Sequence, residues 1–331
     1  MEINNEKIKR FQRDIERIRK ELAKVIVGQK QIIEGIIIAI LSNGHVLLEG
    51  VPGLGKTLLI KSLSQTMDLK FSRIQFTPDL MPADILGTNI LMQGEDGRRF
   101  FKFQEGPIFA QIILADEINR ATPKTQSALL EAMQEQKVTV AGVTRPLGRP
   151  FFVLATQNPL EMEGVYPLPE AQIDRFFFKL KIDYPDYEEL QQIVGQTTVG
   201  ELPLLEKIID GEELCQIQSL VRKVLIASHV LKYATRLTMG THPDSKFATP
   251  QIRRFVRYGA SPRGAQTLVL AGKALAFMEN RFNVSFSDIR EVALPSLRHR
   301  ILLNFEGEAE GVDIDKMIED LIKVTPERED G

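Results

Sequence analysis

The stretch that decides the fold is Gly50-Val51-Pro52-Gly53-Leu54-Gly55-Lys56-Thr57, which matches the phosphate-binding loop pattern in full. Glycines in such a loop let backbone N–H groups turn inward onto phosphate oxygens, where side chains would block them. Lys56 supplies a positive charge to the outer phosphates, and the Thr57 hydroxyl is a ligand for magnesium. The helix that begins here, with Leu58 in its first turn, points its positive end at the anion. We therefore predict a site for ATP and Mg²⁺ at residues 50–58.

An acidic pair supplies the second half of this chemistry. The apolar run Ile112-Ile113-Leu114-Ala115 ends in Asp116 and Glu117. Asp116 is predicted to hold the magnesium, mostly through its water shell, because Mg²⁺ dehydrates reluctantly. Glu117 is predicted to polarise the attacking water as a general base. Such a pair is by itself usually a solvated strand end, but the complete phosphate loop upstream favours the functional interpretation.

Two further polar residues have weaker support. Asn158 ends the next predicted strand, in Ala155-Thr156-Gln157-Asn158-Pro159, and is placed to orient the attacking water. Asn-Pro is also a common turn signal. Arg175 follows a short helical stretch and opens the predicted strand 176–182. A single Arg at a helix end is usually a surface charge or cap, so spacing alone assigns it no role.

Strand and helix patterns alternate through the first 185 residues. We predict strands at residues 45–49, 71–76, 112–116, 151–155 and 176–182. Predicted helices include 7–23, 29–42 and 123–134, the last with Thr122 as its cap and Pro123 at its first position. This alternation predicts an α/β fold with a parallel sheet covered by helices on both faces.

Two predicted β-hairpins interrupt this order. One spans residues 90–103 around the turn Gly94-Glu95-Asp96-Gly97, and the other spans 137–147 around Ala141-Gly142.

The character of the sequence changes after Tyr184-Pro185-Asp186. The remainder is helical in pattern, with an apolar stripe at Leu268, Ala271, Leu275 and Met278. We predict two domains: residues 1–185 form the nucleotide-binding core with N-terminal helices, and residues 186–331 form a small all-helical lid.

Composition argues against several classes of protein. A length of 331 residues suits two domains, and a net charge of −2 offers little attraction to nucleic acid. The single cysteine, Cys215, excludes an internal disulfide and is expected to be buried. The longest apolar run, Ile32 to Leu41, is too short to cross a bilayer. The polar N-terminus lacks the apolar segment of a signal peptide, so we expect a cytoplasmic protein without membrane insertion.

Six blocks of sequence occur in a fixed order along the chain: LEGVPGLGKT at 48–57, IQFTPDL at 74–80, LADEINRA at 114–121, KTQSALLEAM at 124–133, ATQNP at 155–159 and YPLPEAQIDRF at 166–176. Together they resemble the MoxR family of AAA+ ATPases. The resemblance runs from about Val25 to Ile182 almost without a gap and continues less specifically through the helical remainder.

The resemblance implies residue roles that spacing does not. Asn158 falls on the sensor-1 position, and Arg175 falls on the arginine-finger position, which reaches the γ-phosphate held by an adjacent subunit. Such fingers are typically worth ~10³–10⁵ in rate. The segment 259–264 matches sensor 2 and makes Arg263 a second phosphate contact, on its own or a neighbour's nucleotide. Val27-Gly28-Gln29 falls where the family packs the adenine.

The resemblance also implies an assembly and a role. The two hairpins correspond to the helix-2 insert and the pre-sensor-1 insert of this clade. Members form a homo-oligomeric ring, usually a hexamer, and act as chaperone-like remodellers that mature or activate a client protein complex. They commonly work with a von Willebrand A-type domain protein. Arg145 and Val165 depart from the pattern, since an aromatic residue and a threonine are expected there.

Two other functions stay open at this point. One is a nucleic-acid motor or loader, as in other AAA+ branches, against which the near-neutral charge argues. The other is a nucleotide-gated binding module with little turnover, against which the presence of Glu117 argues.

Overall fold

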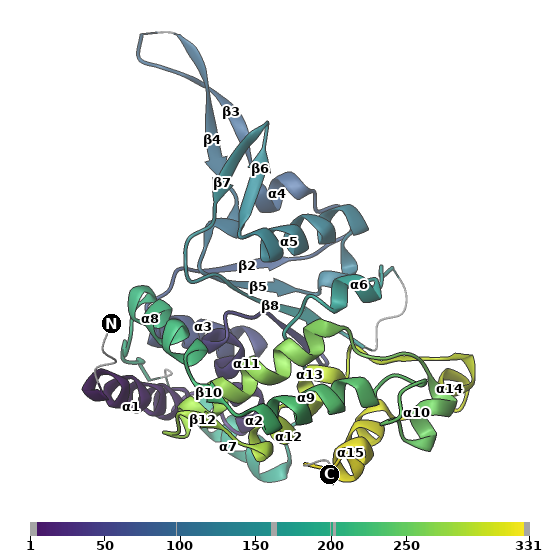
Figure 1. Cartoon of the computed structure of the whole chain (residues 1–331). Helices are drawn as coiled ribbons and strands as arrows, with labels where there is room; N and C mark the ends of the chain where they lie inside the picture. The colour runs from purple at the N-terminus through teal and green to yellow at the C-terminus, as the bar shows by residue number, and fades with distance from the viewer. Residues whose placement is uncertain (1–4, 97, 160–163, 199, 201–202, 328–331) are drawn as a thin grey trace.

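A parallel five-stranded sheet forms the centre of the molecule (Figure 1). The computed structural model describes residues 5–96, 98–159, 164–198, 200 and 203–327. The strand order is β2-β5-β8-β1-β9, and every neighbouring pair is parallel. The strands are β1 (Val46–Glu49), β2 (Phe71–Gln75), β5 (Ile112–Asp116), β8 (Phe152–Gln157) and β9 (Phe178–Lys181). The predicted parallel sheet is therefore confirmed.

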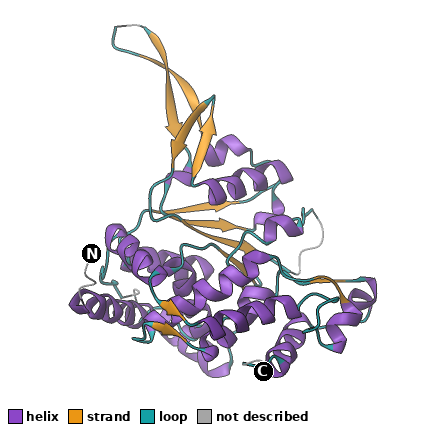
Figure 2. Cartoon of the chain, in the orientation of Figure 1, coloured by secondary structure: helices purple, strands orange, loops and turns teal. Residues whose placement is uncertain are grey.

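Both faces of the sheet are buried, as Figure 2 shows by the helices above and below it. Along β5, Ile112 and Leu114 belong to one apolar cluster, while Ile113 and Ala115 belong to the other. This alternation explains why the strands are apolar throughout, since successive side chains point to opposite faces. The first cluster includes α1 (Asn5–Leu22), α2 (Lys30–Leu41) and α3 (Lys56–Thr66); the second includes α4 (Pro82–Leu86) and α5 (Pro123–Glu135).

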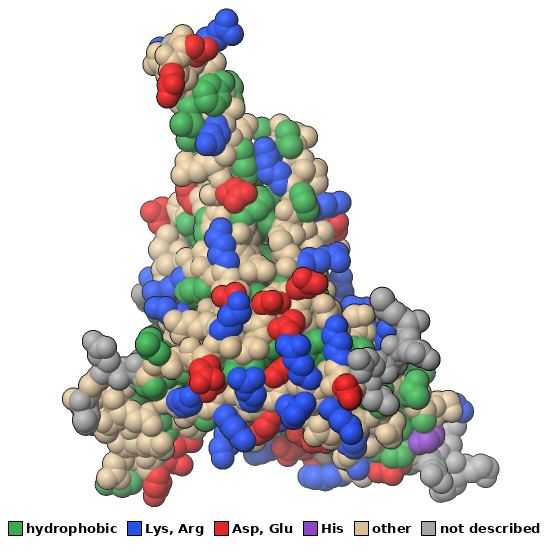
Figure 3. All heavy atoms as spheres, turned by 90° about the vertical axis from the view of Figure 1, so that its left-hand side faces the viewer, with side chains coloured by type: hydrophobic (Ala, Val, Ile, Leu, Met, Phe, Trp, Pro, Cys, Tyr) green, Lys and Arg blue, Asp and Glu red, His purple; other side chains and the backbone are tan. Residues whose placement is uncertain are grey.

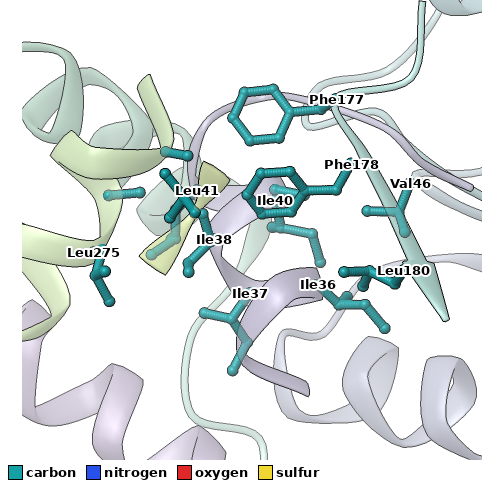
Figure 4. Close-up of a cluster of buried hydrophobic side chains, with 14 of the residues drawn as sticks. Ile36, Ile37, Ile38, Ile40, Leu41, Val46, Phe177, Phe178, Leu180 and Leu275 are labelled. Carbon is teal, nitrogen blue, oxygen red and sulfur yellow. The ribbon is translucent and has the colours of Figure 1, made fainter. Parts of the chain in front are cut away.

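Helix α2 lies between the sheet and the C-terminal helices (Figure 4). Its isoleucines pack toward Val46 of β1 and Leu180 of β9 on one side, and toward Leu275 on the other. Gly35 allows the close approach to the sheet, because a Cβ there would lie 2.8 Å from a methyl of Leu180. The core domain and the C-terminal helices thus share one continuous apolar cluster.

Two hairpins project from the sheet, as predicted (Figure 1). The first pairs β3 (Gly87–Gln93) with β4 (Arg99–Glu105), and the second pairs β6 (Lys137–Val140) with β7 (Val143–Pro146). Gly97 of the first turn lies outside the described residues. The guanidinium of Arg145 lies 3.8 Å from the ring centroid of Phe103 and so joins the two hairpins. Arg145, where the resemblance leads us to expect an aromatic residue, thus contacts an aromatic ring of the other hairpin.

The C-terminal part is a helical assembly that begins with α7 (Tyr187–Thr198). The further helices are α8 (Gly211–Arg222), α9 (Ser228–Gly240), α10 (Pro250–Phe255), α11 (Pro262–Met278), α12 (Phe286–Glu291), α13 (Ala293–Leu297), α14 (Phe305–Ala309) and α15 (Ile314–Val324). The predicted stripe on α11 is buried. Two short strand pairs lie between these helices: β10 (Leu225–Ile226) with β12 (Asn283–Val284), and β11 (Val256–Tyr258) with β13 (Leu302–Leu303). The domain boundary near residue 185 stays a prediction.

Some local predictions need correction. Thr122 takes the N-cap position of α5, but its hydroxyl lies 3.3 Å from the Thr125 hydroxyl and makes no capping bond to the backbone. Cys215 is half-buried, because α8 packs on the core with neighbouring positions such as Leu214. The last strand of the sheet begins at Phe178, two residues later than predicted. In the described ranges, none of the helices has the length and apolar character needed to cross a membrane.

Candidate nucleotide-binding site

The carboxyl ends of the neighbouring strands β2, β5, β8 and β1 lie at one edge of the sheet and form a cavity of about 250 Å³. Ligands of open α/β sheets bind at this edge. The loop after β1, the ends of β2 and β5, and the residue after β8 all contribute to it. Its lining residues are Pro52, Gly53, Gly55, Lys56, Thr57, Arg73, Gln75, Asp116, Glu117 and Asn158. The structure therefore brings together the predicted phosphate loop, acidic pair and Asn158.

The phosphate loop leads from β1 directly into α3. Gly53 and Gly55 have φ of 87° and 75°, in the left-handed region that favours glycine. Gly50 is required for a different reason, because a Cβ there would lie 2.1 Å from Cγ2 of Ile182. Lys56 begins α3, and its Nζ donates to the Gly50 carbonyl at 2.5 Å. Burial lowers the pKa of Lys56, while the Asp116 and Glu117 carboxylates act to raise it.

The two carboxylates are held by different partners. Asp116 Oδ1 accepts from the Thr156 hydroxyl at 2.6 Å, and Oδ2 accepts from Arg73 Nη2 at 2.6 Å. Glu117 Oε2 accepts from Gln75 Nε2 at 2.7 Å and from Arg120 Nη1 at 3.0 Å.

Thr156 also fixes the backbone of the acidic pair. Its hydroxyl accepts from the Glu117 N–H at 2.8 Å, and Glu117 has a left-handed φ of 56°. This sharp turn directs Asp116 and Glu117 into the same cavity from consecutive positions.

A second, more apolar cavity of about 430 Å³ adjoins the loop. Its lining residues are Val25, Ile26, Val27, Gln29, Gly53, Leu54, Gly55, Leu58, Tyr184, Pro185, Leu190, Ile193, Gln196 and Thr197. An apolar cavity beside a phosphate site suits a flat aromatic base. Of the segment predicted to pack the adenine, Val27 and Gln29 line this cavity, beside Leu54 and Leu58 of the predicted phosphate site. Gly28 faces Glu189 instead, because a Cβ there would lie 2.2 Å from Oε1 of Glu189.

Comparison with known proteins identifies the family. Residues 45–178 match the ATPase family associated with various cellular activities (AAA), and residues 251–321 match the AAA lid domain. The chain is 42% identical over 298 residues to Chaperone MoxR1 of Mycobacterium tuberculosis, covering 90% of this chain and 78% of that one. It is 30% identical over 304 residues to Protein MoxR of Methylorubrum extorquens, covering 87% of each. The chain belongs to the MoxR family of AAA+ ATPases.

A solved structure agrees with this assignment. A candidate ATPase from Cytophaga hutchinsonii superposes with a TM-score of 0.90 at 44% identity, covering 96% of each chain. The chain therefore binds and hydrolyses ATP.

Arg175 and Arg263, the two arginines that the MoxR resemblance implies at a nucleotide, do not line the phosphate cavity of their own chain. Arg175 lines a separate polar cavity of about 460 Å³ with residues of α5, and its Nη1 donates to the Leu130 carbonyl at 3.3 Å. Arg263, at the start of α11, donates from Nη1 to Asp174 Oδ2 at 3.2 Å. Both therefore lie near the same loop, beside Asp174, and away from the residues that line the phosphate cavity.

Arg73 and Gln75 are two cavity residues that sequence reasoning missed. The two residues are two positions apart on β2, so both side chains lie on the same face of the strand. There they reach the acidic pair at the end of the neighbouring strand β5. Their polar character at the carboxyl end of a strand beside that pair was an available signal. It depended on knowing that β2 and β5 are neighbours.

Proposed function

We propose that this MoxR-family ATPase hydrolyses Mg²⁺–ATP at sites shared between copies in a homo-oligomeric ring and uses the energy to remodel a client protein complex. The observation that carries the shared site is the position of Arg175. Arg175 lines a separate cavity, while Lys56, Thr57, Asp116, Glu117 and Asn158 line the phosphate cavity. A finger placed in this way serves the nucleotide of a neighbouring copy.

The predicted magnesium ligands fit the ion. The Asp116 carboxylate and the Thr57 hydroxyl line the same cavity, and hard oxygen donors are what Mg²⁺ prefers. The described residues offer no group of three or more His, Cys, Asp or Glu side chains able to hold a metal alone. This suits Mg²⁺, which keeps several waters and binds through few carboxylates plus substrate phosphates. When bound, the ion would neutralise charge on the outer phosphates.

Magnesium removal should therefore abolish turnover. With EDTA in excess, we expect the ATPase rate to fall to background, because the phosphate charge is no longer neutralised. Adding Mg²⁺ back beyond the chelator should restore the rate. Turnover that persists in EDTA would remove Thr57 and Asp116 from their proposed role.

The chain's own residues divide the remaining work. Glu117 takes a proton from the attacking water, and Asn158 orients that water toward the γ-phosphate. Lys56 binds the outer phosphates after leaving the Gly50 carbonyl. Arg263 lies beside the loop that carries Arg175, which supports action on the neighbour's nucleotide rather than its own.

The projecting hairpin supports the remodelling role. Leu91 pairs with Phe101 and Met92 with Phe100 across β3 and β4, so both faces carry exposed apolar side chains. Figure 3 shows such side chains on the hairpin, below a charged tip. On the same view, basic and acidic side chains intermix over the body of the molecule, which favours a protein client over a nucleic-acid backbone.

Phe101→Asp tests this role. We expect the variant to keep the basal ATPase rate and to lose protection of a heat-unfolding model protein against aggregation, measured by light scattering. Phe101 is 73% exposed, so the change leaves the fold intact. Phe305→Asp on α14, where Phe305 is 87% exposed, is the matched control and should protect normally. Equal protection by both variants would contradict a client role for the hairpin.

A further inference from the structure

The helical lid forms several hydrogen bonds to the loop that carries Arg175. Arg300, in the segment after α13, donates from Nε to Asp174 Oδ1 at 2.9 Å and from Nη2 to the Asp174 carbonyl at 3.1 Å. Its Nη2 also donates to the Phe176 carbonyl at 2.7 Å, and its Nη1 to the Phe177 carbonyl at 3.3 Å. One guanidinium thus binds the backbone and a side chain on both sides of Arg175.

Arg300 is nearly inaccessible, with a side chain 2% exposed. Burial lowers its pKa to about 10, against the raising effect of Asp174, so the group stays charged at neutral pH. Removing a charge from water is unfavourable unless it is paired and hydrogen-bonded. Since an apolar side chain would fill such a site at lower cost, the contacts of Arg300 indicate a role in holding the loop in one position.

A second group of lid residues reaches the same carboxylate. At the start of α11, the Ser261 hydroxyl donates to Asp174 Oδ1 at 2.8 Å, and Arg263 Nη1 donates to Oδ2 at 3.2 Å. His299 Nε2 lies 3.1 Å from the Phe176 carbonyl. Two separate parts of the lid therefore contact the core at Asp174.

The side chain of Arg175 is less firmly held than its backbone. Its Nη1 bond to the Leu130 carbonyl is long, at 3.3 Å, and its buried Nε has no hydrogen-bond partner among the residues that the structure describes. The position of the guanidinium is therefore set largely by the loop that Arg300 and Asp174 fix.

We propose that Asp174 and Arg300 are positioning residues that tie the arginine finger to the lid of its own chain. Movement of the lid then moves Arg175 at the neighbouring active site, and the state of one copy's lid is passed to the next copy's nucleotide. This inference rests on the proposed action of Arg175 on a neighbour.

Asp174→Asn removes the charge that holds Arg300, Arg263 and Ser261 while keeping the shape of the side chain. A misplacement of ~1 Å far from the chemistry can lower a rate by about 10²-fold. We expect a loss of kcat of this size with unchanged affinity for ATP, because Asp174 lies away from the phosphate cavity. Ser261→Ala keeps both ion pairs and should give a smaller loss.

Mixed rings separate a displaced finger from general damage to the fold. Glu117→Gln copies cannot hydrolyse but carry an intact finger, and Asp174→Asn copies have an intact cavity but a displaced finger. In an equal mixture of two such variants, about a quarter of the sites combine the intact cavity with an intact neighbouring finger. The mixture should therefore reach about a quarter of the wild-type rate, well above either variant alone.

Two companion mixtures make the result decisive. Arg175→Ala with Glu117→Gln should be rescued equally, and Asp174→Asn with Arg175→Ala should stay inactive. Rescue of Arg175→Ala without rescue of Asp174→Asn would overturn the positioning role alone. Failure of both rescues would instead overturn the action of Arg175 on a neighbour, and the inference with it.

Discussion

Replacing Glu117 with Gln is expected to lower ATP turnover by about 10²–10⁴-fold, the usual contribution of a positioned general base. The amide keeps the size of the side chain but accepts no proton from water at neutral pH. Glu117 has a left-handed backbone conformation, and Gln at this position adds no backbone strain beyond that of Glu. Single-turnover hydrolysis gives the rate, and titration with a fluorescent ATP analogue gives the affinity, which should change little.

A matched control is Glu105→Gln, which neutralises an exposed carboxylate at the end of β4 and should leave turnover unaltered. Wild-type turnover in the Glu117→Gln variant would show that Glu117 is not the general base. Full activity of that variant in cells, together with lost turnover in solution, would favour the nucleotide-gated binding module over the remodelling ATPase.

The sequence predicted the parts of the site that local patterns carry. The phosphate loop and the acidic pair each lie on a single strand end, where apolar runs and glycines mark the backbone conformation. Parallel strands then bring these ends to one edge without further information. The hairpins were equally accessible, because turn residues lie between residues able to pair as strands.

Contacts between distant parts of the chain had no local signal. Arg300 and Asp174 are 126 residues apart, and neither spacing nor composition joins them. Arg73 interacts with Asp116 only because β2 and β5 are adjacent in the sheet. The same limit applies to Arg263, whose motif implies a phosphate contact but whose packing places it against Asp174.

Replacing Arg175 with Ala should lower the specific ATPase rate by ~10³-fold or more, the lower bound for removal of an arginine finger. Nucleotide affinity should change little, because an arginine finger acts on the charge that develops in the transition state. Arg175→Lys keeps the charge but loses the planar fork, so we expect it to restore only part of the rate. ATPase rate and light scattering are measured on the same samples over a range of protein concentrations.

Concentration dependence decides whether the site is shared. A finger supplied by a neighbour makes the wild-type rate per subunit rise with assembly, because an isolated copy lacks the transition-state charge. The alanine variant should assemble to the same scattering mass yet show a low rate at every concentration. A wild-type rate independent of concentration, or an alanine variant as active as wild type, would leave a MoxR-family ATPase that works as a single copy. Arg175 would then be a surface charge held by the Leu130 carbonyl.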